Sequence, residues 1–273
     1  MIYEALRNAL VAQRPVVLAT VIEGDPIGAK LLIEPGSAPL GTLGNADVDR
    51  VVARDALGEL AAGITSTRHY GPNGEARERA LSVFIESFAP PPRMIIFGAV
   101  DFTAALARVA KLLGYHVTVC DARPVFGTTA RFPMADVVAN DWPDRFLDSL
   151  IDPLTQRDAI CVLTHDTKFD VPAVVGALAT DVGYLGAMGS RRTHNARLAR
   201  LREAGVSDAQ LTRVRSPIGL DLGGRTPEET AVSICAEIIS LRTGRAGVPL
   251  ALSDGPIHNQ AAFDGLGFTA QLS

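Results

Sequence analysis

The chain has 273 residues, 47% of them hydrophobic, and a formal net charge of −4 at pH 7. This length fits one large domain or two smaller ones with a real buried core. The negative charge argues against a nucleic-acid binder. No apolar run reaches the ~18–20 residues of a membrane span, and the first residues lack a signal-peptide pattern. The three cysteines (Cys120, Cys161 and Cys235) fall in apolar segments, so we expect reduced core residues in a cytoplasmic protein without a metal site.

Residues 1–88 predict a small α+β domain. Asn45 is a plausible N-cap for its main helix, and Gly63 a plausible stop. The predicted elements are helices over 1–13 and 47–60, strands over 16–21, 28–33, 64–70 and 80–88, and a tight glycine-bounded turn over 41–44.

Residues 89–92 (Ala-Pro-Pro-Pro) predict a stiff linker, because the three prolines favour extended polyproline geometry. The segment 93–244 then predicts a Rossmann-like, doubly wound parallel α/β sheet. Its strands are expected at 94–97, 116–120, 136–139, 159–163 and 184–188, and its helices at 101–113, 144–150, 172–179, 191–205 and 227–242. Thr226, Pro227 and Glu229 mark the start of the last helix as a capping box. The tail 245–273 has weak periodicity, and we expect it to be irregular.

The turn at Gly98 departs from the phosphate-binding pattern G-x-G-x-x-G, in which the second glycine lets the backbone approach a pyrophosphate. Val100 occupies that place, and Asp101 puts a negative charge where the anion would sit. Asp121, at the end of the next strand, lies at the right distance to hold a ribose, although an aspartate there is common in this fold. The sequence therefore predicts the fold without tight dinucleotide binding at this turn.

Ligands of a doubly wound sheet bind beyond the carboxyl ends of its strands, where the sequence places several polar stretches. His165 can bind a ligand or move a proton, with Asp166 beside it. The alternative is a loop histidine bonded to its neighbours and an aspartate that caps a helix.

A second stretch, Gly186 to Arg192, contains two glycines (Gly186 and Gly189), a hydroxyl (Ser190) and two arginines (Arg191 and Arg192) where a helix begins. Free amides, the helix dipole and guanidinium groups all favour an anion such as a phosphate. The alternative, a turn followed by a solvated basic helix, is weakened because arginine is disfavoured at a helix N-terminus.

Two further candidates are less specific. Asp221 and Arg225 flank closely spaced glycines and can form a pair, and Lys30 in the first domain is either an anion contact or a solvent-facing strand residue. No H-E-x-x-H, C-x-x-C, G-x-S-x-G or P-loop is present, so metal-hydrolase and nucleophile hypotheses lack support.

Together these stretches resemble the XdhC/CoxI family over roughly residues 10–244. The second domain carries an ordered run of motifs, which is far more specific than any one alone. They are FAPPPR leading into IIFGA, then VTVCDARPVF, LTHD, YLGAMGSRRTH and SPIGLDLGGRTPEE. The first domain matches more weakly, through LAT, GAKLLI and the turn into a helix at Asp47.

The resemblance implies an accessory or maturation protein for molybdenum hydroxylases such as xanthine dehydrogenase and carbon monoxide dehydrogenase, and not a catalytic subunit. Such proteins are thought to bind molybdenum cofactor, help its sulfuration with a cysteine desulfurase and hand it to the target. The implied partners are thus a molybdenum hydroxylase and a cysteine desulfurase, and a homodimer is left open.

Two departures mark a divergent member. The family commonly has a glycine-glycine-cysteine-valine-glutamate run where this chain has residues 45–49, so Asp47 stands in place of the cysteine. The family's glycine-alanine-glycine-histidine turn is Gly98-Ala99-Val100-Asp101 here. The first departure excludes a thiolate at that position and puts sulfuration through the protein's own cysteine in doubt.

The first hypothesis is a cofactor carrier that binds molybdenum cofactor between its two domains, with Arg191 and Arg192 on the phosphate and Lys30 closing the site. The predicted cofactor-binding residues are Lys30, Gly98, Asp121, His165, Asp166, Gly189, Ser190, Arg191, Arg192, Asp221 and Arg225.

Two other hypotheses remain. An NAD(P)-dependent oxidoreductase would use Asp121 and Arg123 at the ribose and His165 as proton donor, but Val100 and Asp101 argue against it. A scaffold that binds only the target enzyme is the third.

Overall fold

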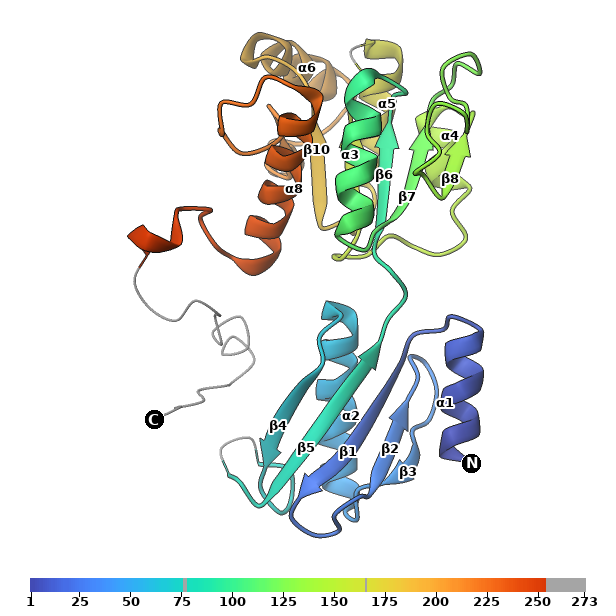
Figure 1. The fold of residues 1–273 in the computed structure, drawn as a ribbon, viewed down its shortest axis with the longest axis vertical. Helices are drawn as coiled ribbons and strands as arrows, with labels where there is room; N and C mark the ends of the chain where they lie inside the picture. Colours follow the sequence, from blue (N-terminus) through green and yellow to red (C-terminus); the bar gives the residue numbers. More distant parts are fainter. Residues whose placement is uncertain (76–77, 165, 254–273) are drawn as a thin grey trace. The chain divides into compact units, whose positions relative to one another are not determined.

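The structure, a computed structural model, describes residues 1–75, 78–164 and 166–253. It divides into two units, Met1–Pro90 and Pro91–Ser273 (Figure 1), and the division falls within the segment 89–92. Each unit has its own sheet and its own hydrophobic core, so each is described separately.

The N-terminal unit is a five-stranded antiparallel sheet of order β3-β2-β1-β5-β4. Successive side chains of a strand point to opposite faces. Val17, Ala19 and Val21 therefore pack with one helix, α2, and Val16 and Leu18 with the other, α1. The elements are α1 (Ile2–Val11), β1 (Val16–Glu23), β2 (Lys30–Ile33), β3 (Leu40–Thr42), α2 (Ala46–Ala62), β4 (Ser66–Tyr70) and β5 (Leu81–Phe88).

The predicted ends of α2 are confirmed. The Asn45 side chain accepts a hydrogen bond from the Asp47 amide at 2.8 Å, and Gly63 ends the helix at φ 67°. The predicted turn over 41–44 is wrong in part, because Leu40–Thr42 pairs with β2. Gly41 permits this pairing: its φ is +101°, and a Cβ there would lie 2.3 Å from the Lys30 carbonyl oxygen.

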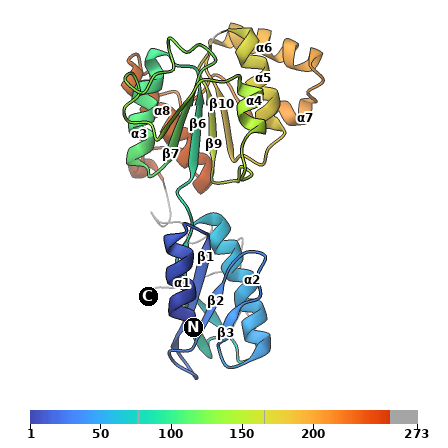
Figure 2. The ribbon, with the colours of Figure 1, turned by 90° about the vertical axis from the view of Figure 1, so that its right-hand side faces the viewer.

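The C-terminal unit is a six-stranded parallel sheet of order β11-β10-β9-β6-β7-β8, which is the doubly wound order of a Rossmann fold. The fold class predicted from the sequence is confirmed. Helices α3 and α8 cover one face and α4, α5 and α6 the other (Figure 2). The elements are β6 (Arg93–Phe97), α3 (Asp101–Leu112), β7 (His116–Cys120), β8 (Val137–Ala139), α4 (Pro143–Asp148), β9 (Ala159–Val162), α5 (Thr167–Leu178), β10 (Tyr184–Ala187), α6 (Arg191–Glu203), α7 (Asp208–Leu211), β11 (Val214–Arg215), α8 (Pro227–Thr243) and a 3-10 turn at Leu250–Leu252.

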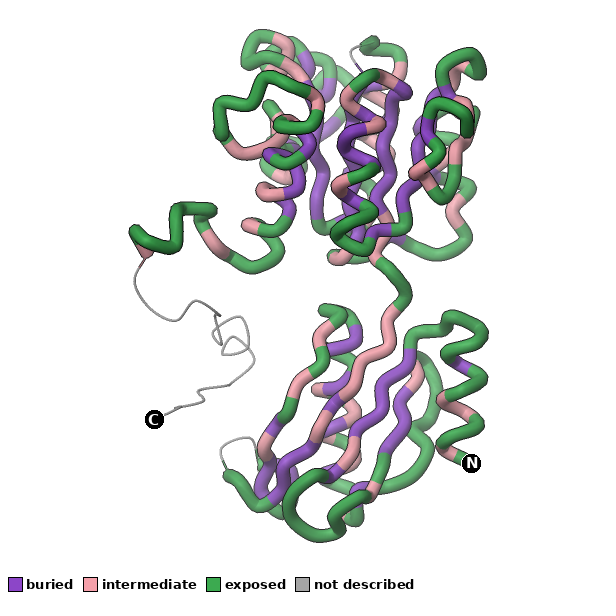
Figure 3. Tube along the Cα trace, viewed as in Figure 1, coloured by how far each residue is buried: buried purple, intermediate pink, exposed green. Residues whose placement is uncertain are grey.

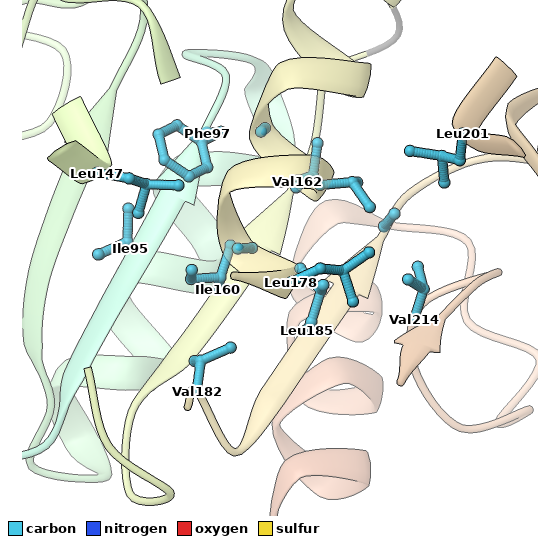
Figure 4. Close-up of a cluster of buried hydrophobic side chains, with 14 of the residues drawn as sticks. Ile95, Phe97, Leu147, Ile160, Val162, Leu178, Val182, Leu185, Leu201 and Val214 are labelled. Carbon is cyan, nitrogen blue, oxygen red and sulfur yellow. The ribbon is translucent and has the colours of Figure 1, made fainter. Parts of the chain in front are cut away.

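The central strands of this sheet are buried on both faces, as Figure 3 shows. Ile95 and Phe97 of β6 enter the core beneath α4 and α5 (Figure 4), and Met94 and Ile96 enter the core beneath α3 and α8. This double packing holds the strand ends in place, so the loops that follow them start from fixed positions.

Three features of this unit differ from the prediction or extend it. Helix α5 begins at Thr167, five residues before the predicted start at Pro172, because Asp166 caps it through the Lys168 amide. Helix α7 and the two-residue strand β11 were not predicted. The predicted irregular tail is described only to residue 253.

Over the described ranges, no helix is both long enough and apolar enough to span a membrane.

Candidate functional site

The loops that follow β6, β7, β9 and β10 leave the same edge of the parallel sheet. The strand order reverses between β6 and β9, and ligands of doubly wound sheets bind in the crevice at such a switch point. Gly98, Asp121, Asp166 and the stretch 189–192 therefore all come from this carboxyl edge.

The crevice itself is nearly closed. Gly98 has a φ of +109°, and a Cβ at this position would lie 2.9 Å from the Thr164 amide nitrogen. The cleft beside it offers the centre of a water molecule about 10 Å³, roughly the minimum for a single water. Its lining residues are Phe97, Gly98, Cys120, Asp121, Ala122, Pro143, Thr164 and Phe169. A ligand of nucleotide or pterin size would therefore lie over this edge and not within it.

Asp121 is an internal anchor. Its carboxylate accepts the Ala99 amide at 2.7 Å, the Arg123 amide at 2.9 Å and two bonds from the Arg123 guanidinium at 2.9 and 2.8 Å. Burial opposes ionisation of Asp121, but these hydrogen bonds outweigh it and hold its pKa below the usual value. Both carboxylate oxygens are thus engaged by the protein, which counts against the predicted ribose contact.

Arg123 also joins a group of aromatic side chains. Its guanidinium carbon lies 4.5 Å from the ring centre of Phe126 and 5.6 Å from that of Phe169. The Phe169 ring lies 4.9 Å from that of Trp142, the only tryptophan of the chain. We call Arg123, Phe126, Trp142 and Phe169 the aromatic cluster. The sequence analysis missed it, because three separate segments supply its members.

The N-terminus of α6 carries the predicted anion-binding stretch. Gly189 turns the chain at a φ of +147°, and Ser190 caps the helix by accepting the Thr193 amide at 3.1 Å. Arg191 and Arg192 are exposed, and within the described residues no hydrogen bond or ion pair engages their side chains. The positive end of a 13-residue helix thus holds two unneutralised guanidinium groups, an arrangement that an anion stabilises.

Arg197, which the sequence analysis also missed, anchors α6 to neighbouring segments through a buried ion pair and hydrogen bonds. Its side chain is 2% exposed and pairs with Asp170 of α5 at 2.8 Å. It also donates to the Ser216 hydroxyl at 2.9 Å and to the Met188 carbonyl at 2.6 Å. One guanidinium therefore joins the loop after β10, helices α5 and α6, and the loop after β11. The signal was its spacing, because Arg197 lies four residues before the inward-facing Leu201.

The remaining predicted site residues of the C-terminal unit are Asp221, Arg225 and His165. Asp221 and Arg225 do not form the ion pair that the sequence allows, since both are exposed and no salt bridge joins them. Their role in cofactor binding stays a prediction. Gly223 (φ +69°) turns the chain there, and the Arg225 amide donates to Glu229, which completes the cap of α8. His165 lies outside the described residues.

Lys30 belongs to the N-terminal unit. Its ammonium donates to the Thr20 hydroxyl at 3.0 Å on the neighbouring strand, and the residue is exposed. Its role as an anion contact stays a prediction.

The three thiols are free and buried, as expected. Burial raises the pKa of Cys120, which lines the cleft, to about 12, and that of Cys235 to about 12. Burial also raises the pKa of Cys161 well above its usual value. Among the residues described, no three histidine, cysteine, aspartate or glutamate side chains are grouped to hold a metal ion.

Two family models match the chain. The model of the XdhC Rossmann domain covers residues 94–238, more than half of the sequence, and that of the XdhC and CoxI family covers residues 9–71. The chain belongs to the XdhC and CoxI family.

Relatives with curated descriptions agree with this XdhC assignment. The chain is 33% identical to a probable xanthine dehydrogenase subunit of Bacillus subtilis (strain 168), over 60% of this chain and 47% of that protein. It is 30% identical to the molybdenum cofactor insertion chaperone PaoD of Escherichia coli (strain K12), over 59% of this chain and 44% of that protein. The chain thus spans less than half the length of both relatives.

A solved structure supports the XdhC fold. The crystal structure of a xanthine dehydrogenase from Bacillus halodurans superposes with a TM-score of 0.54 at 21% identity, covering 92% of this chain and 97% of that one. At this identity the likeness concerns the fold alone.

Proposed function

We propose that this XdhC-family protein is an accessory factor that binds molybdenum cofactor and delivers it to an enzyme of the xanthine dehydrogenase or carbon monoxide dehydrogenase type. The observation that carries the proposal is the N-terminus of α6, where Arg191 and Arg192 stand without partners in the described structure. The name of PaoD, a molybdenum cofactor insertion chaperone, supports the same interpretation.

The residues at this helix end fit the phosphate of a pterin cofactor. Hydrogen bonds to charged groups contribute about 1.5–3 kcal/mol each, and a guanidinium can give a phosphate two of them. The Ser190 hydroxyl, beside the two arginines, accepts the Thr193 amide and is the capping group of the helix. Bound here, the phosphate neutralises two guanidinium groups that otherwise oppose the dipole of α6.

The cofactor brings its own molybdenum chemistry, and the chain only holds and releases it. Sulfur for its maturation has to come from a partner such as a cysteine desulfurase, because Asp47 replaces the family's common cysteine and all three thiols are buried. Three unpaired thiols also suit the cytoplasm, where we place the transfer. The receiving partner is a molybdenum hydroxylase.

The test is anaerobic incubation of the purified protein with molybdenum cofactor, followed by gel filtration and assay of molybdenum and pterin in the protein peak. Stoichiometric retention of both supports the carrier, and its elution volume reports whether the protein is a homodimer. Retention of neither, beside a family member that retains both, overturns the proposal.

The assignment of the phosphate site needs a variant. Arg191→Ala should lower retention at least about 10-fold, the loss expected for one charge-assisted contact. Arg200→Ala is the matched control, because Arg200 is an exposed arginine nearer the other end of α6. Equal retention by both variants would remove Arg191 from the site.

An NAD(P)-dependent oxidoreductase remains the second candidate, favoured by the Rossmann strand order. The engaged carboxylate of Asp121 and the branched Val100 count against it. Titration with NAD(P), monitored by Trp142 fluorescence, tests this second candidate. Saturable quenching supports an oxidoreductase, and the absence of quenching rejects it.

A further inference from the structure

The aromatic cluster presents flat surfaces at the carboxyl edge. Phe126 and Trp142 are 41% and 39% exposed, although burial of such side chains ordinarily stabilises a fold. Aromatic residues make up only 5% of the chain, so two half-exposed rings in one group are an unusual concentration of exposed apolar surface.

The cluster is also held rigidly. Two nitrogens of Arg123 donate to Asp121, and its guanidinium contacts the rings of both Phe126 and Phe169. Arg131 donates to the Phe126 carbonyl at 3.0 Å, which fixes the loop after β7. A surface already held in its binding conformation loses little entropy when a ligand stacks on it.

A carboxylate stands beside the rings. Asp166 caps α5 and lies three residues before Phe169 at the start of this helix. Asp166 is exposed, and one of its oxygens accepts the Lys168 amide at 3.0 Å. The other oxygen can accept N–H groups from a ligand, since an ionised carboxylate is an acceptor only.

We propose that the aromatic cluster is a stacking subsite for a planar fused ring, and that Asp166 accepts N–H groups from the 2-amino-4-oxo-pyrimidine edge of that ring. Pterins and guanine share this edge. The proposal rests on the proposed function, because it assigns the ring of the carried molecule to the cluster and its phosphate to α6.

The spacing of the strands allows one ligand to reach both places. Phe169 and Asp166 follow β9, which neighbours β10 and the start of α6, and Arg123 follows β7, three strands from β10. Neighbouring strands lie about 4.8 Å apart, so the subsite is about 5–14 Å from the α6 N-terminus. A small elongated molecule with a ring at one end and a phosphate at the other spans this distance.

Titration of the full chain with pterin, GMP, AMP and CMP, followed by Trp142 fluorescence, tests the subsite. Pterin or GMP should quench saturably and bind at least about 10-fold tighter than AMP and CMP, which lack the shared edge. GMP carries a phosphate that pterin lacks, so the two rings are compared in the Arg191→Ala variant. Tighter binding of pterin by this variant assigns the subsite to the pterin ring, and tighter binding of GMP assigns it to a guanine nucleotide. No saturable quenching by either, or equal binding of all four, overturns the proposal.

Single substitutions in the aromatic cluster and at Asp166 test whether the ring binds there. Phe126→Ala should weaken the preferred ligand about 5- to 150-fold, the range for one stacked ring, and Phe126→Tyr should restore it. Asp166→Asn keeps a capping oxygen but removes the charge, and should weaken binding about 10-fold. Tyr3→Ala, which removes an exposed ring in the other unit, is the matched control and should change nothing.

The two proposals can fail separately. Pterin has no phosphate, so Arg191→Ala should leave its binding unchanged while lowering retention of the whole cofactor. If Arg191→Ala lowers retention but Phe126→Ala and Asp166→Asn bind pterin and GMP as the parent does, the carrier stands and the stacking subsite falls. If pterin or GMP binds but molybdenum cofactor is not retained, the proposed carrier function is rejected.

Discussion

Among the residues that the structure describes, each unit buries one arginine, and the two are used differently. Arg68, on β4, is 3% exposed and pairs with Glu59 and Asp55 of α2. Arg197, on α6, is 2% exposed and contacts Asp170, Ser216 and Met188. The first joins one helix to the strand beside it, whereas the second joins segments that form the carboxyl edge. The same chemistry stabilises a fold in one unit and positions a candidate site in the other.

The largest effect is expected from Arg197→Leu. It leaves the buried Asp170 without this guanidinium, and removing one partner of a buried pair costs about 3–5 kcal/mol. Urea unfolding followed by Trp142 fluorescence, which reports on this unit, measures the loss. Cofactor retention by the folded variant, measured without urea, should fall as well, since the start of α6 loses its support.

The double variant Arg197→Leu/Asp170→Leu is the control for the first prediction. It should regain part of the stability, because the buried carboxylate of Asp170 is removed together with the guanidinium that pairs with it, but retention should stay low. Full retention by the folded single variant would contradict the positioning role of Arg197.

Arg68→Leu should cost a similar about 3–5 kcal/mol but leave retention unchanged. Glu59, 1% exposed, then keeps a buried charge without its guanidinium. The N-terminal unit contains no tryptophan, so its unfolding is followed by far-UV circular dichroism. If Arg68→Leu lowers retention per folded molecule as strongly as Arg197→Leu, the contrast between the two arginines is broken.

A smaller effect sharpens the contrast within the C-terminal unit. Gly98 and Gly114 flank α3, and both have positive φ, +109° and +81°. Alanine at either costs about 1–2 kcal/mol from the backbone alone. Only at Gly98 would the new methyl meet another segment, the Thr164 amide at 2.9 Å, whereas nothing lies within 4 Å at Gly114. Gly98→Ala should therefore lower the urea midpoint more, and equal midpoints would show that the crevice can open.

Local signals in the sequence account for most of the fold. Asn45 and Thr226 mark helix starts with capping side chains, and the apolar run of β6 identifies a buried parallel strand. These signals act over a few residues, so one chain suffices to recognise them. The proline in α5 misled the prediction, because Pro172 lies within the first turns of a helix that Asp166 had already begun.

The candidate site was less accessible to sequence reasoning. The stretch 189–192 was predicted because the charges and the turn are adjacent in the chain. The aromatic cluster was not, since Arg123, Trp142 and Phe169 come together only when β7, β8 and β9 are assembled in one sheet. Arg197 was missed for another reason: a charged residue on a polar helix is expected to be solvated, and only its partners on other elements justify its burial.

The burial of all three thiols bears on how the proposed carrier would release its cofactor. A cysteine binds a metal as its thiolate, and burial encloses the three thiols of this chain in its core and raises the pKa of each. Under the proposed carrier function, a molybdenum centre held at the surface would therefore find no thiolate ligand among the described residues of this protein. In that proposal the lack of a thiolate bond favours release, because a receiving enzyme then needs only a slightly higher affinity for the cofactor to complete the transfer.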